Sequence, residues 1–484
     1  MKSLSSLDSK SNSMFEKLDK IFFGTPFKII YLLFSFMTYF IVTYGTSWMS
    51  VGVWASAITG TILFLYRVIR IPNYIKTKRI WILIAFYISY IISLVLNINY
   101  GYAEAVKALV WMAFHYYLLY ACDVKQEPKV YQKEFHIIAN VYLAILFAAA
   151  IASFVLLCIG YSYYSMRGEF EIVGGFTWGR LWGVFTDPNY GSVFCSIGII
   201  LSLYFFHTWK NIVLRILYIC NILMLSIYII FSDSRTGIVA IMFSLAFYFY
   251  ALLIRWEKFK LKMVWKQIIS ILIAMVIMVG VYFIPKGVTA AYNQIVENVT
   301  SNQMIEDPSE PPTNNKVFGR EQDLEDDISN GRLELWYSSV EIFLTKPIFG
   351  VSFFNLRDYA LAELPDTYLI TKPNGKVNNP HSVIFNILAG QGIVGITIFF
   401  IFCGAVFIYI VRRFYRVEKK DYHYIIVLMS SIVACGVSML FLSDVFYVHT
   451  PNSFVFWTFL GYLMHYFRNK IPLPFRGFQK KEKE

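Results

Sequence analysis

The sequence predicts an all-α membrane protein with about 12 transmembrane helices, both termini cytoplasmic, and one large outer loop that carries an interfacial helix. Of the 484 residues, 57% are hydrophobic and only 15% are charged, whereas a soluble chain carries roughly a quarter of charged residues. The apolar residues fall in long runs, and Lys and Arg gather in short clusters between these runs. Soluble, disordered and fibrous classes are therefore excluded.

The apolar runs define the predicted spans. About 20 apolar residues cross the hydrocarbon core as a helix, and these runs are too continuous for barrel strands. The predicted spans are residues 27–45, 48–66, 80–97, 103–121, 136–160, 189–207, 213–231, 236–254, 267–284, 391–411, 423–441 and 454–467. The polar N-terminus lacks a short apolar core with a small-residue cleavage site, so the first run is expected to remain as a span.

The positions of the basic residues predict the orientation. With the N-terminus inside, the inner segments hold 31 of the 43 Lys and Arg residues, and the short outer loops hold only Arg167, Arg180 and Arg235. Cytoplasmic loops carry such an excess. The net charge of +12 is thus explained by loops next to anionic lipid, and no nucleic-acid partner is expected. The six cysteines lack metal-site spacing and are expected to be buried apolar residues.

Three parts follow from the spans. Residues 1–285 form an N-terminal membrane bundle of nine helices. Residues 286–380 form a large extracytoplasmic loop between the ninth and tenth spans. Residues 381–484 hold the last three membrane helices and a basic cytoplasmic tail.

The two halves of the large loop differ. Residues 298–330 are rich in Pro, Asn, Asp and Glu, and this composition predicts a flexible segment. The second half predicts an amphipathic helix along the membrane surface, because apolar residues recur there at helical spacing. These residues are Leu333, Trp336, Val340, Phe343 and Leu344, and Pro347 and Gly350 are expected to end the helix.

Charged residues near the outer ends of spans are candidate site residues, because they are costly there unless they pair or face water. The first group is Arg180 with Asp187-Pro188-Asn189, before the sixth span. It predicts a capped helix start, where Arg180 and free N–H groups either face an anionic ligand or only stabilise the helix end. The second is Arg235, in so short a turn that it must lie at the membrane edge. It either pairs with Asp233 or has a functional task.

The third and fourth groups flank the predicted surface helix. Arg332 and Trp336 lie at its start, where the alternative is an ordinary charged helix face. His381 and Asn386 lie where the loop returns to the membrane. The small residues Gly390, Gly392 and Gly395 follow and allow close helix packing there, so His381 is placed at the entrance of a packed site.

These residue types predict a phosphate-bearing substrate and a proton transfer. Guanidinium groups match phosphate oxygens and keep their charge at the bilayer edge, and a histidine can exchange a proton near neutral pH. No nucleotide, zinc or serine-hydrolase motif is present. The triplet Glu325-Asp326-Asp327 is the nearest candidate for a metal motif, but it lies in the acidic half of the loop. No metal and no other cofactor is expected.

Taken together, the four groups resemble the O-antigen ligase/polymerase superfamily of bacterial membrane proteins. The resemblance rests on Arg180 with Asp187-Pro188-Asn189, on Ser234-Arg235 and Gly237, on Arg332 with Trp336, Pro347 and Gly350, and on His381-Ser382 followed by Gly392 and Gly395. It covers roughly residues 175–411. The large loop is longer and more acidic than a compact ligase loop.

This resemblance implies a metal-independent glycosyltransferase of the membrane GT-C type in the bacterial cytoplasmic membrane. Its donor is a sugar chain on undecaprenyl pyrophosphate. The matching arginines, Arg235 and Arg332, would hold the pyrophosphate, and His381 would act on the acceptor hydroxyl. We expect these three as catalytic residues and Arg180, Asp187, Asn189, Trp336 and Asn386 as substrate-binding residues.

Three functions stay open from the sequence. A polymerase of lipid-linked repeat units is placed slightly ahead of a ligase that moves the finished chain to a lipid A core or a protein. A lipid-linked oligosaccharide flippase would instead predict charges deep within spans. The expected partners are the lipid-linked oligosaccharide, a glycan or glycolipid acceptor, the bilayer, and a chain-length regulator or other polysaccharide-export proteins.

Overall fold

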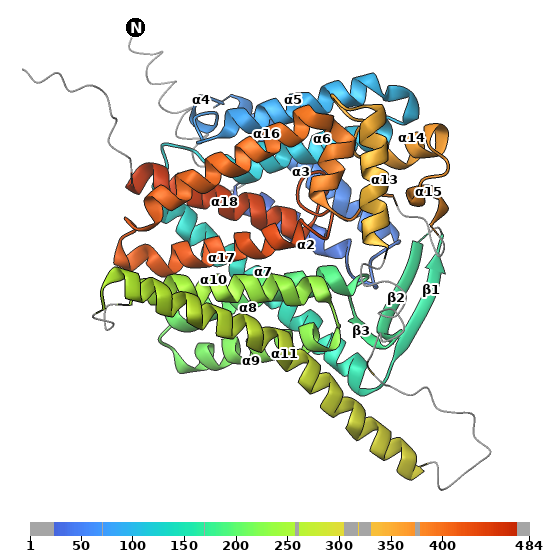
Figure 1. Cartoon of the computed structure of the whole chain (residues 1–484). Helices are drawn as coiled ribbons and strands as arrows, with labels where there is room; N and C mark the ends of the chain where they lie inside the picture. Colours follow the sequence, from blue (N-terminus) through green and yellow to red (C-terminus); the bar gives the residue numbers. More distant parts are fainter. Residues whose placement is uncertain are drawn as a thin grey trace, which may run out of the picture.

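The computed structural model describes residues 24–69, 71–168, 170–256, 261–303, 318, 331–372 and 378–471, and these residues are mostly helical (Figure 1). The predictions for the N-terminal tail, the Glu325-Asp326-Asp327 triplet and the basic C-terminal tail fall outside the described residues. So does most of the segment 298–330 that is predicted to be flexible.

The elements follow in chain order. The helices up to residue 254 are α2 (Thr25–Met37), α3 (Ser47–Val68), α4 (Ile71–Tyr74), α5 (Ile80–Leu96), η2 (Ile98–Tyr100), α6 (Ala103–Ala113), the π-helix η3 (Phe114–Tyr120), α7 (Pro128–Cys158), α8 (Pro188–Thr208), α9 (Ile212–Phe231) and α10 (Arg235–Ile254). The later helices are α11 (Met263–Gln303), α13 (Arg332–Thr345), α14 (Leu356–Glu363), α15 (Tyr368–Thr371), α16 (Val383–Phe414), η4 (Lys419–Asp421), α17 (Tyr422–Ser438) and α18 (Pro451–Lys470). The strands are β1 (Ser162–Arg167), β2 (Phe170–Thr177) and β3 (Arg180–Gly183).

Among the described residues, eight helices are long and apolar enough to cross a membrane, namely α3, α7, α8, α9, α10, α11, α16, and α17 together with η4. Each coincides with a predicted span. The other four predicted spans correspond to α2, α5, α6 with η3, and α18, which are helical but shorter, interrupted or more polar. The predicted span 27–45 is wrong at its C-terminal end, because α2 stops at Met37. Twelve spans and the orientation therefore stay predictions.

The prediction that the chain is all-α is wrong in one segment. An antiparallel three-stranded sheet in the order β1-β2-β3 lies between α7 and α8. Its short strands mix polar residues and glycines with aromatic and branched ones, so they lack the long apolar run that predicts a membrane helix. The last strand begins at Arg180 and ends four residues before Asp187. The sheet thus holds the chain that enters α8.

The centre of the bundle contains α8 and α18, and α11 lies at its edge. In the most apolar window of α8, 78% of the residues are buried, against 11% in α11. Figure 1 shows α11 along one side of the bundle, with its C-terminal end projecting beyond the other helices. This helix continues through Pro285 to Gln303, so the first part of the segment 286–380 is helical.

A buried ion pair ties the first helix to the centre. Lys28 Nζ lies 2.9 Å from Glu134 Oε2, and both side chains are less than 10% exposed. Tyr462 donates to the same oxygen at 2.7 Å, and Thr25 donates to Oε1 at 3.0 Å. Such a pair is tolerated in the interior because further hydrogen bonds satisfy the carboxylate. It joins α2, α7 and α18.

The predicted surface helix is confirmed as α13, but its apolar face is oriented differently from the prediction. The side chains that pack against the protein are Leu335, Ser338, Ser339 and Ile342. Leu333 and Leu344, from the predicted apolar face, are 58% and 68% exposed. The two hydroxyls bond back to carbonyls one turn earlier, so small polar residues can face inward without unmet hydrogen bonds. Whether α13 lies along the membrane surface is not tested and stays a prediction.

Close packing at the glycine run is confirmed, and it fixes α13 to α16. Gly392 breaks α16 with φ +61° and ψ −159°. Ile393 N donates to Pro347 O at 2.8 Å, and Val351 N donates to Ala389 O at 3.0 Å. The chain that leaves α13 is therefore bonded to the backbone on both sides of the break.

Gly392→Ala is expected to destabilise the protein by roughly 3 kcal/mol, because this φ and ψ combination is almost restricted to glycine. An added Cβ would also lie 2.5 Å from the Ile348 carbonyl. The thermal midpoint in detergent measures the loss. Gly404→Ala is the matched control in the same helix, since its Cβ would meet nothing within 4 Å. Equal midpoints for the two variants would contradict the prediction.

Candidate functional site

Arg180 connects the sheet to two helix starts. Its side chain is 7% exposed. Nε donates to Ser232 O at 2.9 Å, and Nη2 donates to Asn189 Oδ1 at 3.4 Å. Because these acceptors lie in the α9–α10 turn and in α8, Arg180 holds that turn against the start of α8.

The start of α8 has the predicted cap. Asp187 is the N-cap and Pro188 the first helical residue. Asp187 Oδ1 accepts from Asn189 N at 2.7 Å, which satisfies one of the free N–H groups at the helix end. Asn189 Oδ1 also accepts from Ser234 Oγ at 3.0 Å. The first and second candidate groups are therefore brought together.

Arg235 is the first residue of α10. Ser234 is the N-cap and accepts from Gly237 N at 3.0 Å, and Asp233 before it has φ +46°. The guanidinium of Arg235 is exposed. A cation gains nothing from the positive end of its own helix, but that helix end and the arginine together suit an anionic ligand.

The start of α13 presents Arg332 and Trp336. The Arg332 guanidinium lies 5.7 Å from the centre of the Phe441 ring. Trp336 stacks on Phe385 with ring centres 4.9 Å apart and an angle of 14°. Its indole nitrogen is buried and has no hydrogen-bond partner among the described residues.

His381 lies in the chain that enters α16. It has φ +51°, a conformation that is uncommon for residues other than glycine and asparagine, and its N–H donates to Asn379 Oδ1 at 3.0 Å. The residue as a whole is half-buried, and desolvation by the surrounding protein lowers the pKa of His381 to about 4. Asp187 opposes this shift, whereas the positive charges of Arg332 and Lys372 add to it.

Asn386 connects α16 to a segment that the sequence analysis did not include. Its Nδ2 donates to Ser443 Oγ at 2.6 Å, and Ser443 Oγ donates to Asn379 Oδ1 at 2.7 Å. Asn386 is fully buried, and its Oδ1 has no partner among the described residues. The loop before His381 is thus held by the chain between α17 and α18.

That α17–α18 segment, residues 439–450, is not helical and is almost entirely buried. Its Asp444 is 0% exposed. Asp444 Oδ2 accepts from Ser438 Oγ at 2.8 Å and from Asn452 Nδ2, while Oδ1 has no partner among the described residues. Burial raises the pKa of Asp444 to about 6. The rule applied to Arg235, a charge next to a span, would also have selected Asp444.

The raised pKa of Asp444 predicts a pH-dependent stability. The Asp444 carboxyl binds a proton less tightly in the unfolded state than in the folded state. Its contribution to the free energy of unfolding is therefore complete below about pH 4 and is lost as the pH rises through about 6. A pKa shift of about two units corresponds to about 3 kcal/mol in the free energy of unfolding. Asp444→Asn is expected to remove this decline. Thermal midpoints of both proteins from pH 4.5 to 7.5 measure it, and parallel curves would contradict it.

The charges of Asp187 and Arg332 both influence the pKa of His381, so these three residues form one cluster. Arg180, Asn189 and Ser234 form a second cluster, joined to the first through the bond between Asn189 and Asp187. In the described part of the chain, no three His, Cys, Asp or Glu side chains are grouped to hold a metal ion. The chemistry that these residues offer is anion binding next to a neutral imidazole.

Arg235, Arg332 and His381 lie in one stretch of the sequence that is similar to a known protein family. Residues 219–400 match the model of the family described as O-antigen ligase. Over these residues, the chain is similar to the O-antigen ligase family. The resemblance predicted from the motifs is confirmed for this part of the chain. No curated protein matches the chain.

The stretch that matches the O-antigen ligase family covers five of the eight predicted site residues, Arg235, Arg332, Trp336, His381 and Asn386. Arg180, Asp187 and Asn189 precede it and contact it through the turn before α10. Enzymes of this ligase and polymerase type act in the membrane on lipid-linked glycans during polysaccharide biosynthesis. The eight candidate spans fit a multi-pass membrane protein.

Proposed function

We propose that this protein is a membrane glycosyltransferase that polymerises undecaprenyl-pyrophosphate-linked repeat units of a surface polysaccharide. The reaction takes place on the outer face of the bacterial cytoplasmic membrane. The observation that carries the proposal is that Arg235, Arg332 and His381, each at the start of a helix or next to one, lie within the stretch that matches the O-antigen ligase family. The charges of Asp187 and Arg332 both influence the pKa of His381.

The arginines bind the leaving group. Arg332 and Arg235 stand at the starts of α13 and α10, where their guanidinium groups can hold the donor's pyrophosphate by paired hydrogen bonds. They offset the negative charge that develops on pyrophosphate as its bond to the sugar breaks. Arg180 acts through the turn that carries Arg235. These cations provide the charge compensation, so the proposal includes no metal ion.

His381 is the general base. The neutral imidazole accepts the proton of the acceptor hydroxyl, the acceptor oxygen bonds to the sugar's anomeric carbon, and undecaprenyl pyrophosphate leaves with the bonding electrons. Desolvation keeps the ring neutral in the free enzyme. A bound pyrophosphate next to the ring would raise its pKa, because an adjacent negative charge favours the protonated form, and the base would become stronger when substrate is present.

A ligase reaction is the second candidate. The spacing from His381-Ser382 to Gly392 and Gly395 favours it, as does the description of the matching family. The two reactions share the donor and the residues above. They differ in the acceptor, which is a second lipid-linked repeat for the polymerase and a lipid A core or a protein for the ligase.

Purified protein in liposomes, supplied with a cognate lipid-linked repeat unit as the only substrate, distinguishes these functions. A ladder of lengthening chains on a gel is expected, and it should persist in EDTA. If the donor stays unchanged when it is the only substrate, and is consumed once a lipid A core or protein acceptor is added, the result would favour the ligase. A donor that is never consumed but crosses the bilayer would overturn both in favour of a flippase.

A further inference from the structure

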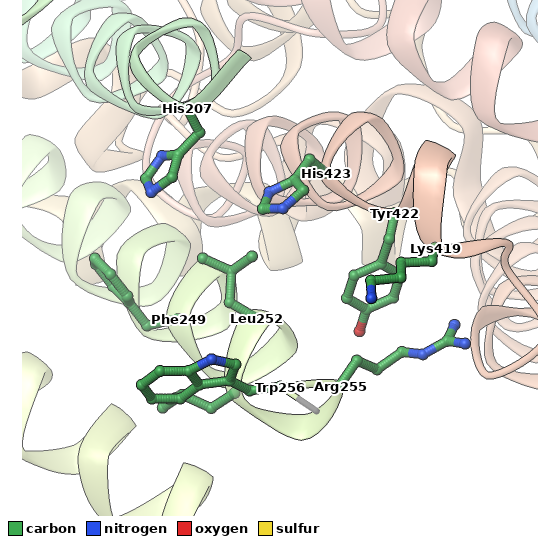
Figure 2. A pocket seen from close by; sticks show the side chains of 9 residues that line it. His207, Phe249, Leu252, Arg255, Trp256, Lys419, Tyr422 and His423 are labelled. Carbon is green, nitrogen blue, oxygen red and sulfur yellow. The ribbon is translucent and has the colours of Figure 1, made fainter. Parts of the chain in front are cut away.

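A cavity of about 580 Å³ opens at the other end of the helices that hold the candidate site (Figure 2). It is lined by the C-terminal ends of α8 and α10 and by the start of α17 with η4. Asp187 and Arg235 stand at the opposite ends of α8 and α10. Helices of about 20 residues are roughly 30 Å long, close to the hydrocarbon thickness. The cavity therefore lies about one bilayer away from the candidate site.

Basic side chains surround this cavity. Arg255 comes from α10, Lys419 from η4, His207 from α8 and His423 from α17. The rings of His207 and His423 lie parallel, with centres 5.9 Å apart and an angle of 19°. No carboxylate is among the described residues that line it. The cavity thus gathers two permanent positive charges and two imidazoles.

Arg255 is held by neutral groups. Its Nη1 donates to Val417 O at 2.6 Å, and its guanidinium lies 4.7 Å from the centre of the Tyr422 ring. Neither contact neutralises its charge. Lys420 forms an ion pair with Glu418 at 2.6 Å. Lys420 does not line the cavity.

One wall of the cavity is apolar. Phe249 and Leu252 come from the last turns of α10 and Trp256 follows its end, and Figure 2 shows Leu252 between the imidazole of His423 and the indole of Trp256. Trp256 is 48% exposed. Tryptophan is common at the level of lipid headgroups. A basic rim above an apolar wall suits a molecule with a phosphate group and a hydrocarbon tail.

We propose that this cavity binds the phosphodiester headgroup of an anionic phospholipid, with an acyl chain against the apolar wall. Basic pockets between membrane helices at the cytoplasmic side recognise such headgroups, and this end of the bundle carries the basic clusters that the positive-inside rule assigns to the cytoplasm. The cavity volume falls within the usual range for small-molecule sites. This proposal does not depend on the reaction at the other face.

Native mass spectrometry of the purified full chain, titrated with dioleoylphosphatidylglycerol and with dioleoylphosphatidylcholine, tests this site. The wild-type protein is expected to prefer the anionic lipid. The double variant Arg255→Gln/Lys419→Gln should bind it roughly 30-fold more weakly, because each basic residue near the surface contributes on the order of a factor of five. Lys420→Gln is the matched control and should stay within about twofold of the wild type.

A second variant tests the site without changing its charge and without removing the hydrogen bond from Arg255 to Val417 O. Leu252→Trp fills the cavity and should also weaken binding of the anionic lipid about tenfold or more, while the net charge is unchanged. An equal loss in Lys420→Gln would overturn the proposal in favour of a diffuse basic belt. Displacement of the lipid by about 10 mM inorganic phosphate would overturn it in favour of a free-phosphate site.

Discussion

Replacing Arg332 by alanine is expected to reduce glycan transfer by a factor of roughly 10² to 10³, the usual cost of removing one donor that stabilises a developing oxyanion. Arg332 stands at the start of α13 with its guanidinium over the Phe441 ring, and its charge reaches His381. Product formation from a lipid-linked repeat in liposomes measures the loss. Arg332→Lys should recover only part of it, because an ammonium group lacks the planar fork of guanidinium.

The control for this variant is Lys346→Ala. Lys346 is an exposed cation just after the other end of the same helix, so its removal changes the net charge by the same amount without touching the cluster. Its transfer rate should match the wild type. If Arg332→Ala is correctly folded and also keeps the wild-type rate, the assignment of Arg332 as the pyrophosphate ligand is wrong.

Replacing His381 by asparagine should abolish transfer while leaving the fold intact. Asparagine tolerates the left-handed conformation found at His381, where φ is +51°, but it cannot accept the acceptor's proton as an imidazole does. A loss of roughly 10² to 10⁴ is expected for a general base. Elution by gel filtration and the thermal midpoint should remain close to those of the wild type.

The pH profile separates a base from a merely structural histidine. The imidazole is active when neutral, so transfer should fall as the pH drops through its pKa. In kcat/KM, which reports the free enzyme, this fall should be centred near pH 4, where the pKa of His381 lies. In kcat it should occur at a higher pH, because the bound pyrophosphate raises the pKa. Identical profiles in wild type and His381→Asn would contradict a role as base.

The sequence was sufficient for features that depend on local chemistry. The eight long apolar helices follow from run length alone, and the cap at Asp187 follows from the Asp-Pro-Asn pattern. The sheet was missed because its short strands contain no long apolar run and give no membrane signal. The position of Asp444 next to a span could have been noticed, but its partners, Ser438 and Asn452, lie on two different helices, and only the fold brings them together.

Candidate roles were harder to predict than candidate positions. That Arg180 binds substrate stays a prediction, and its position is explained by bonds to a carbonyl in the α9–α10 turn and to the side chain of Asn189. The orientation of α13 was also missed. Two serines turned inward there because their hydroxyls return to the helix backbone, a possibility that hydrophobicity alone does not include.

The buried α17–α18 segment has a consequence for biosynthesis. Ser443, which holds the loop of His381 through Asn379 and Asn386, is synthesised only after the helices from α2 to α17. Its segment is fixed by Trp457 of α18, which donates to Val445 O at 2.8 Å. A nascent chain that has inserted every earlier helix therefore still lacks the support of its proposed base. The protein would become competent only when α18 has packed against this segment, so chains that lack α18 would not consume lipid-linked precursors.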